Sequence, residues 1–137
     1  MAHVLALQGP SNSGKTETLI RLCHDLRAKY PDATFESLLK SEGRDIKVIL
    51  RGVRGKTIGI ESRGDPNSRL EESLADFVAR KCDIIFCACR TSGMTVDWVN
   101  ALSPRHRVQF VPKARANRDP AAANARTAAS LMELAGL

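Results

Sequence analysis

The eight residues that follow the first short apolar run constrain this chain most. Residues 9–16 read Gly-Pro-Ser-Asn-Ser-Gly-Lys-Thr and match G-x-x-x-x-G-K-[ST] at every position. The apolar run at residues 4–7 predicts a buried strand before them, and the periodicity of residues 17–30 predicts a helix after them. Glycines let the backbone curl so that N–H groups converge, and the helix start adds unpaired donors and its positive dipole end. The segment is therefore expected to bind phosphate.

A strand, this loop and a helix in that order resemble the start of the P-loop NTPases, through the loop and not through any one member. A chance match in a surface loop is the alternative, and the flanking strand and helix disfavour it. The resemblance implies that Lys15 reaches the β- and γ-phosphates of a nucleoside triphosphate and that the Thr16 hydroxyl binds Mg²⁺. Lys15 is expected to be exposed and bonded chiefly to the ligand. The expected nucleotide-binding residues are Gly9, Pro10, Ser11, Asn12, Ser13, Gly14, Lys15, Thr16 and Glu17.

Length and composition predict one globular domain without a membrane segment. The chain has 137 residues, 43% of them hydrophobic, and no apolar stretch approaches the ~20 residues needed to cross a bilayer. The first strand follows Met1-Ala2-His3 directly and leaves no room for a signal peptide, so we expect a cytoplasmic protein. Cys87 and Cys89 lack zinc or redox spacing, and all four cysteines are expected to be buried thiols.

The net charge of +6 permits an acidic partner without requiring one. Five cations without an intervening acid stand out: Arg105, Arg107, Lys113, Arg115 and Arg118. Only Phe110 could stack a base there, so a solvated face or a rim that helps to hold the nucleotide's charge is favoured over a nucleic-acid surface. Nucleic acid is therefore not required as a partner.

The remaining strands and helices alternate along the chain. Runs at residues 46–53 and 56–61 flank Arg54-Gly55, which predicts an antiparallel hairpin with the first run at the exposed sheet edge. Gly59 in the second run indicates a close approach to the strand backbone. The apolar run at residues 83–89 predicts a central parallel strand covered on both faces. Residues 32–44 fit either a short helix or an edge strand.

Together these elements predict an α/β three-layer sandwich with a mostly parallel sheet and an antiparallel edge hairpin. Further helices are expected from about residue 68 to 81, at residues 96–102 and from Pro120, and a last strand at residues 108–111. The hairpin before the strand at residues 56–61 resembles the arrangement in the GTPase and kinase-like branch of P-loop proteins.

Two acidic residues near the end of that strand are candidates for the metal site. P-loop proteins need a carboxylate at the end of a neighbouring strand to organise the metal through its water shell, and Glu61 and Asp65 are in position. Glu61 is preferred because the sheet fixes the strand end. The pattern departs from the usual one, since Gly59 interrupts the apolar run and a glutamate takes the first acidic position. The alternative is a loop that only caps the following helix.

Arg90 completes the candidate site. It follows the most apolar strand, and ligands of open parallel sheets lie beyond the carboxyl ends of the strands. Arg90 is therefore a candidate internal arginine finger for the γ-phosphate, with Arg63 as its rival. A plain loop, with Thr95 capping the next helix, is an equally open interpretation. The candidate catalytic residues are thus Lys15, Glu61 and Arg90, and the candidate metal ligands are Thr16, Glu61 and Asp65.

These candidates favour Mg²⁺-dependent binding and hydrolysis of a nucleoside triphosphate that switches or drives a protein partner. GTPases of the branch named above read guanine with Asn-Lys-x-Asp, and this chain has Pro-Lys-Ala-Arg at residues 112–115, which favours ATP or an unselective site. Transfer of the γ-phosphate to a small hydroxyl acceptor, and nucleotide-dependent binding without turnover, are the alternatives. Only residues 32–45 and 103–119 are free for an acceptor-binding insert or a lid, which disfavours the kinase.

Overall fold

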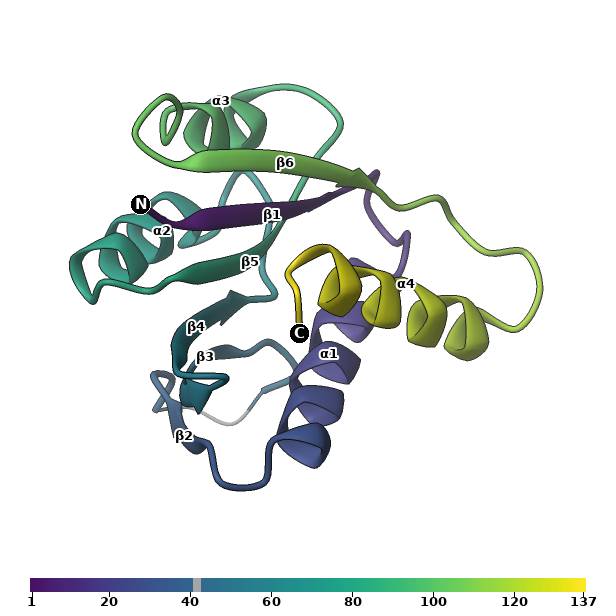
Figure 1. The fold of residues 1–137 in the computed structure, drawn as a ribbon. Coiled ribbons are helices and arrows are strands. Elements are labelled where there is room, and N and C mark those ends of the chain that lie inside the picture. The colour runs from purple at the N-terminus through teal and green to yellow at the C-terminus, as the bar shows by residue number, and fades with distance from the viewer. Residues whose placement is uncertain (41–42) are drawn as a thin grey trace.

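A six-stranded mixed sheet forms the centre of the protein, and four helices cover its two faces (Figure 1). The computed structural model describes residues 1–40 and 43–137. The elements in chain order are β1 (His3–Gln8), α1 (Lys15–Lys29), β2 (Thr34–Ser37), β3 (Lys47–Val53), β4 (Lys56–Glu61), α2 (Leu70–Ala79), β5 (Ile84–Cys89), α3 (Met94–Asn100), β6 (Arg107–Pro112) and α4 (Pro120–Leu134). The strand order is β2-β3-β4-β5-β1-β6. The expected α/β class is confirmed.

Four of the strands run parallel. β1 pairs with β5 on one side and with β6 on the other, and β5 also pairs with β4. β5 is the central strand expected at residues 83–89, and all six of its side chains are buried. Because the carboxyl ends of parallel strands meet at one edge of a sheet, the loops after β1, β4, β5 and β6 all leave from that edge.

The antiparallel part differs from the expectation at its edge. β3 and β4 form the expected hairpin, with Arg54 and Gly55 at φ 51° and 75° in the turn. β3 is not the edge strand, however, because residues 34–37 form β2 and pair with its outer side. Three consecutive side chains of β3 are buried, whereas all four of β2 are exposed. The open choice is thus settled as an edge strand for residues 34–37, while residues 41 and 42 of that stretch lie outside the described residues.

The strand that carries Glu61 is not a direct neighbour of β1, the strand before residues 9–16, which are called the phosphate loop after their expected role. β5 lies between β4 and β1, so the expectation of adjacent strands is wrong. The six apolar side chains of β5 fit this central position, where helices cover both faces of the sheet. The loop after β4 must therefore cross the end of β5 to reach the phosphate loop.

Alternation of side chains along the strands separates two cores. On β1, Leu5 and Leu7 pack with α1 and α4, whereas Val4 and Ala6 pack with α2 and α3. Gly59 of β4 faces the second core, where a Cβ atom would lie 2.7 Å from the Phe77 ring of α2. The close approach expected at Gly59 is thus made by this ring.

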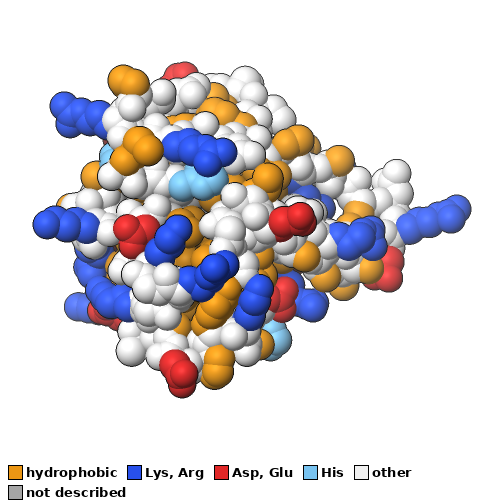
Figure 2. Space-filling view, viewed as in Figure 1, with side chains coloured by type: hydrophobic (Ala, Val, Ile, Leu, Met, Phe, Trp, Pro, Cys, Tyr) orange, Lys and Arg blue, Asp and Glu red, His pale blue; other side chains and the backbone are white. Residues whose placement is uncertain are grey.

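Charged side chains on the visible face are interspersed with hydrophobic ones. Figure 2 shows Lys and Arg side chains spread over this face, without one continuous basic patch. Some of them lie at the end of the protruding part of the molecule that α4 and the segment before it form. Within residues 1–40 and 43–137, no helix is long and apolar enough to cross a membrane.

Candidate functional site

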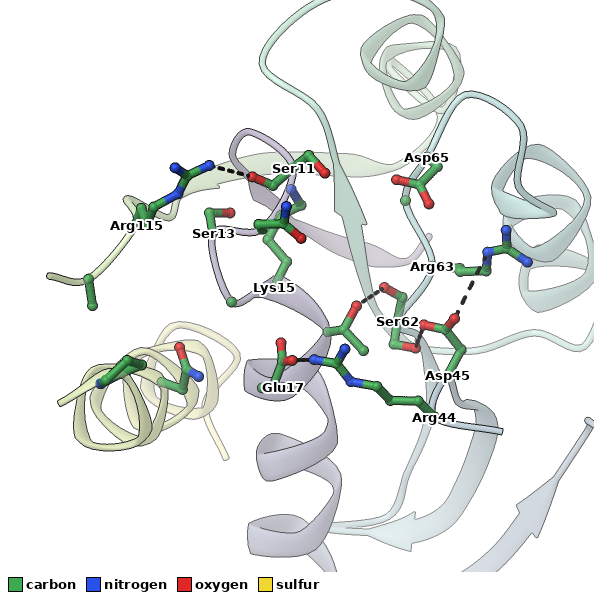
Figure 3. Close-up of a pocket in the computed structure, with 17 residues that line it drawn as sticks. Ser11, Ser13, Lys15, Glu17, Arg44, Asp45, Ser62, Arg63, Asp65 and Arg115 are labelled. Carbon is green, nitrogen blue, oxygen red and sulfur yellow. Dashed lines mark hydrogen bonds and ion pairs between the residues drawn. The ribbon is translucent and has the colours of Figure 1, made fainter. Parts of the chain in front are cut away.

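A cavity of about 520 Å³ lies over the N-terminus of α1, at the edge of the sheet where the parallel strands end (Figure 3). This volume lies within the range of about 300–1,000 Å³ that is common for small-molecule sites. Three segments line it, namely residues 11–17, residues 44, 45 and 62–65, and residues 115, 116, 120 and 124. The first is the phosphate loop with the start of α1, the second flanks the β3–β4 hairpin, and the third joins β6 to α4.

The phosphate loop leads directly into α1. Gly14 precedes the helix at φ 90°, and no side chain in residues 1–40 or 43–137 caps the helix N-terminus. Asn12 also has a positive φ, of 60°, so the loop turns sharply before the helix begins. A Cβ atom at Gly14 would meet the side-chain oxygen of Asn124 at 2.6 Å, so glycine allows α4 to pack closely here. The uncapped first turn offers backbone donors to an anion.

Lys15 lies folded back across its own loop. Its ammonium donates to the carbonyl oxygens of Gly9 at 2.6 Å and Pro10 at 2.7 Å, and the residue is only 9% exposed. The expectation of an exposed lysine is therefore wrong, because a buried ammonium needs acceptors and the loop carbonyls supply them. Burial lowers the pKa of Lys15 from its usual value, and the nearby charge of Arg90 lowers it further.

Thr16 connects the start of α1 to the loop after β4. Its hydroxyl oxygen lies 3.5 Å from the carbonyl oxygen of Ser62, and both residues line the cavity. Glu17, the last expected loop residue, forms an ion pair with Arg44 across the cavity rim.

Glu61 is outside the cavity lining and faces the opposite side of the sheet. Ile58 and Ile60 of β4 pack on the α1 side, so alternation turns Glu61 toward α2. There the fully buried carboxylate accepts hydrogen bonds from both Arg69 Nε and Ser73 Oγ at 2.6 Å, from Arg69 Nη2 at 2.9 Å and from the Arg63 backbone N at 3.1 Å. The structure does not bring Glu61 together with Lys15 and Thr16. The Glu61 carboxylate instead contacts Arg69 and Ser73 at the start of α2.

Asp65 lines the cavity, and Arg90 contacts it from outside the cavity lining. Gly64 passes over the end of β5, where a Cβ atom would collide with the Ala88 carbonyl group, and this close passage carries Asp65 toward the phosphate loop. Arg90 Nη2 donates to Asp65 Oδ1 at 2.8 Å, while Arg90 Nε is buried without a partner among the described residues. The Arg90 backbone N donates to Thr95 Oγ1, and α3 has no side-chain cap. The structure thus places Lys15, Thr16 and Asp65 in the cavity lining, with Arg90 bonded to Asp65 beside it.

Several cavity residues had not been singled out from the sequence. Asp45 accepts a hydrogen bond from Ser62 Oγ at 2.9 Å and pairs loosely with Arg63 at 3.9 Å. An aspartate shortly before a strand is an ordinary loop feature, so no sequence signal marked it. Asn124 had one weak signal, because it interrupts an alanine-rich helix in which asparagine is less favourable.

One of the five clustered cations belongs to the cavity. Arg115 lines it and donates from Nη2 to the Ser11 carbonyl oxygen at 3.1 Å. Lys113 instead lies buried and donates to the Ala114 carbonyl oxygen; burial lowers its pKa, and Arg126 adds to this effect. The expected rim around the nucleotide's charge is therefore reduced to Arg115 on this side.

The charges of the cavity leave two cations without a carboxylate partner in the part of the chain that the structure describes. Glu17 pairs with Arg44, Asp45 with Arg63 and Asp65 with Arg90, whereas Lys15 and Arg115 bond only to loop carbonyl oxygens. An anion at the α1 N-terminus would therefore face two positive charges that are not neutralised.

The donors at the cavity suit a magnesium ion that arrives with phosphates. Within residues 1–40 and 43–137 no group of three or more His, Cys, Asp or Glu could hold a metal. Thr16, Asp45 and Asp65 offer oxygen atoms, and Mg²⁺ is commonly bound by one or two carboxylates together with waters and substrate phosphates.

Comparisons of this chain with models of known protein families, with curated proteins and with solved structures found no match.

Proposed function

We propose that this protein binds a nucleoside triphosphate with Mg²⁺ in the cavity at the α1 N-terminus and hydrolyses it, as a P-loop NTPase. The observation that carries this proposal is the meeting of an uncapped helix N-terminus with Lys15 and Arg115, two cations that bond only to neutral carbonyl oxygens of the loop. Exchange of these carbonyls for phosphate oxygens would replace neutral acceptors by charged ones, which adds the attraction of an ion pair to each hydrogen bond.

The residues at the two ends of the cavity indicate the orientation of the nucleotide. Thr16, the proposed metal ligand, lies beside Ser62, so the β- and γ-phosphates belong at the end formed by residues 62–65. The nucleoside would then extend toward Arg115, Ala116 and Asn124 at the other end of the cavity. Residues 112–115 offer no aspartate to pair with a guanine edge, which supports ATP or an unselective site.

The chain's own residues divide the chemistry between binding and charge stabilisation. Lys15 would hold the β- and γ-phosphates, and Arg90 would release Asp65 and turn toward the transferring phosphoryl group as negative charge builds up. Bound Mg²⁺ would supply positive charge that offsets the negative charge of the phosphates, with Thr16 among the residues that would hold it. Water is the favoured acceptor, and a protein that responds to the nucleotide state is the proposed partner.

The direct test is to incubate the purified protein and Mg²⁺ with ATP or GTP labelled in the γ-phosphate, with and without a metabolite extract. Release of inorganic phosphate supports hydrolysis, whereas label on a metabolite would assign a kinase. Binding without turnover under every condition would leave a nucleotide-dependent binding module.

Lys15→Ala provides the matched binding test. We expect it to weaken ATP binding by about 100-fold, since it removes a charged partner of the phosphates. Lys56→Ala, at the exposed start of β4, is the control and should bind like the parent. Equal ATP affinity of Lys15→Ala and parent in calorimetry would exclude the phosphate-loop interpretation.

A further inference from the structure

Asp45 lies at the end of the cavity near Thr16, the proposed metal ligand, and this end is called the metal end. A short hydrogen-bonded network around Ser62 holds Asp45 there. Ser62 Oγ donates to Asp45 Oδ1 at 2.9 Å and accepts from the Ile46 backbone N at 2.8 Å. The Ser62 backbone N donates to the Ile46 carbonyl oxygen at 3.0 Å. These three bonds fix the segment before β3 against the loop after β4, so the position of the Asp45 carboxylate is defined by the fold.

The same serine connects Asp45 to the proposed metal ligand. The Ser62 carbonyl oxygen lies 3.5 Å from Thr16 Oγ1, while its hydroxyl holds Asp45. Figure 3 shows Ser62 between the start of α1 and Asp45, with Asp65 farther along the same loop. Ser62 is therefore the single residue that links Asp45 to Thr16, since it contacts both side chains.

Glu61, Asp65 and Glu17 are each bonded to other side chains more strongly than Asp45 is. Glu61 is buried on the α2 side with four hydrogen bonds, and Asp65 is in a 2.8 Å ion pair with Arg90. Glu17 forms an ion pair with Arg44. The cation that Asp45 faces is Arg63, at 3.9 Å and with both side chains partly exposed, which makes a weak pair. Asp45 Oδ2 consequently keeps lone pairs free for further donors.

We infer that Asp45 is the carboxylate that organises the water shell of Mg²⁺ in this protein, with Ser62 as the residue that positions it. This inference rests on the proposed function, because the metal would arrive with the nucleotide. Mg²⁺ gives up its waters reluctantly, so a carboxylate that accepts hydrogen bonds from metal-bound waters fits its chemistry. The metal end of the site is then built by the segment before β3 and not by the end of β4.

The test compares the Mg²⁺ requirement of nucleotide binding in isosteric variants. A fluorescent ATP analogue is titrated into the protein at a series of Mg²⁺ concentrations. Asp45→Asn should raise the Mg²⁺ concentration for half-maximal binding by about tenfold or more, while affinity without Mg²⁺ changes little. Ser62→Ala should give a smaller rise, since the carboxylate remains but is less well oriented. Asp32→Asn, an exposed aspartate in the turn after α1, is the matched control and should behave like the parent.

A second readout does not depend on turnover or on the nucleotide analogue. Mn²⁺ bound together with ATP is followed by electron paramagnetic resonance, and Asp45→Asn should release more free Mn²⁺ than the parent at equal concentrations. If Asp45→Asn fails to fold, as judged from its melting curve, Asp45→Glu keeps the charge and an acceptor for Ser62. It should raise the Mg²⁺ requirement by a smaller factor of about three.

The outcomes separate this inference from the function on which it rests. A parent protein that binds no triphosphate at any Mg²⁺ concentration would remove the proposed function itself. A parent that binds Mg²⁺-ATP, with an Asp45→Asn variant whose Mg²⁺ requirement is unchanged, would overturn only the assignment of Asp45. A shift produced by Asp65→Asn or Glu61→Gln alone would transfer the role to that residue.

Discussion

Replacing Glu61 by glutamine distinguishes a structural carboxylate from a metal-site carboxylate. Glu61 Oε1 and Oε2 accept bonds from the Arg69 guanidinium at 2.6 and 2.9 Å, and Ser73 Oγ and the Arg63 backbone N complete the set. Glutamine has the same shape, but it lacks the charge and turns one acceptor into an NH₂ group that faces donors. Removing one partner of a buried ion pair costs about 3–5 kcal/mol. Because the Arg69 side chain is 24% exposed, water compensates in part, and we expect a loss near the lower limit, about 3 kcal/mol.

Urea unfolding followed by circular dichroism measures this loss directly. For a chain of this size, 3 kcal/mol corresponds to a decrease in Tm of roughly 10 °C. Glu72→Gln, an exposed carboxylate in the first turn of α2, is the control and should change stability by less than about 0.5 kcal/mol. Combining Glu61→Gln with Arg69→Met should recover part of the loss, because the guanidinium is then no longer left unpaired. An unchanged unfolding midpoint together with a large loss of turnover would refute the structural role and return Glu61 to the metal site.

Two further predictions follow from the site and the core. Arg90→Ala should lower turnover by ~10³-fold with nearly unchanged nucleotide binding, and Arg63→Ala should not; full turnover of Arg90→Ala in a phosphate-release assay would contradict this assignment. Burial raises the pKa of Cys82 to about 11 and that of Cys89 to about 11, so both thiols stay protonated near neutral pH. Iodoacetamide at pH 8 should therefore label them only after unfolding, and labelling of the native protein detected by mass spectrometry would contradict their burial.

Local sequence patterns predicted the elements whose structure is decided by near neighbours. The hairpin turn at Arg54-Gly55 was found because positive φ is needed there, and the central strand β5 because its apolar run is buried on both faces. The loop before α1 was found from the spacing of its glycines and lysine. The helix predicted from Pro120 was found because proline is favoured in the first turn, and the side chain of Asp119 before it accepts a hydrogen bond from the Ala122 backbone N.

The order of the strands in the sheet was harder to predict from the sequence. The four residues of β2 have no buried side chain and hence no hydrophobic pattern, so only pairing with β3 marks them as a strand. The insertion of β5 between β1 and β4 is a long-range contact that spacing along the chain does not encode. Both errors concern which strands are neighbours, a property of the whole sheet.

The sequence by itself determined the strand, loop and helix around Lys15 and Thr16, and an α/β fold that places loop ends at one edge. It also contained the alternation that turns Glu61 away from α1, since Ile58 and Ile60 occupy that face. Only the tertiary structure decided which acids reach the cavity. Asp45 arrives there because Ser62 holds the segment before β3, and Asp65 because Gly64 passes closely over β5. Each depends on contacts between segments that are distant in sequence, and a side chain's type does not reveal whether a partner elsewhere in the chain already binds it.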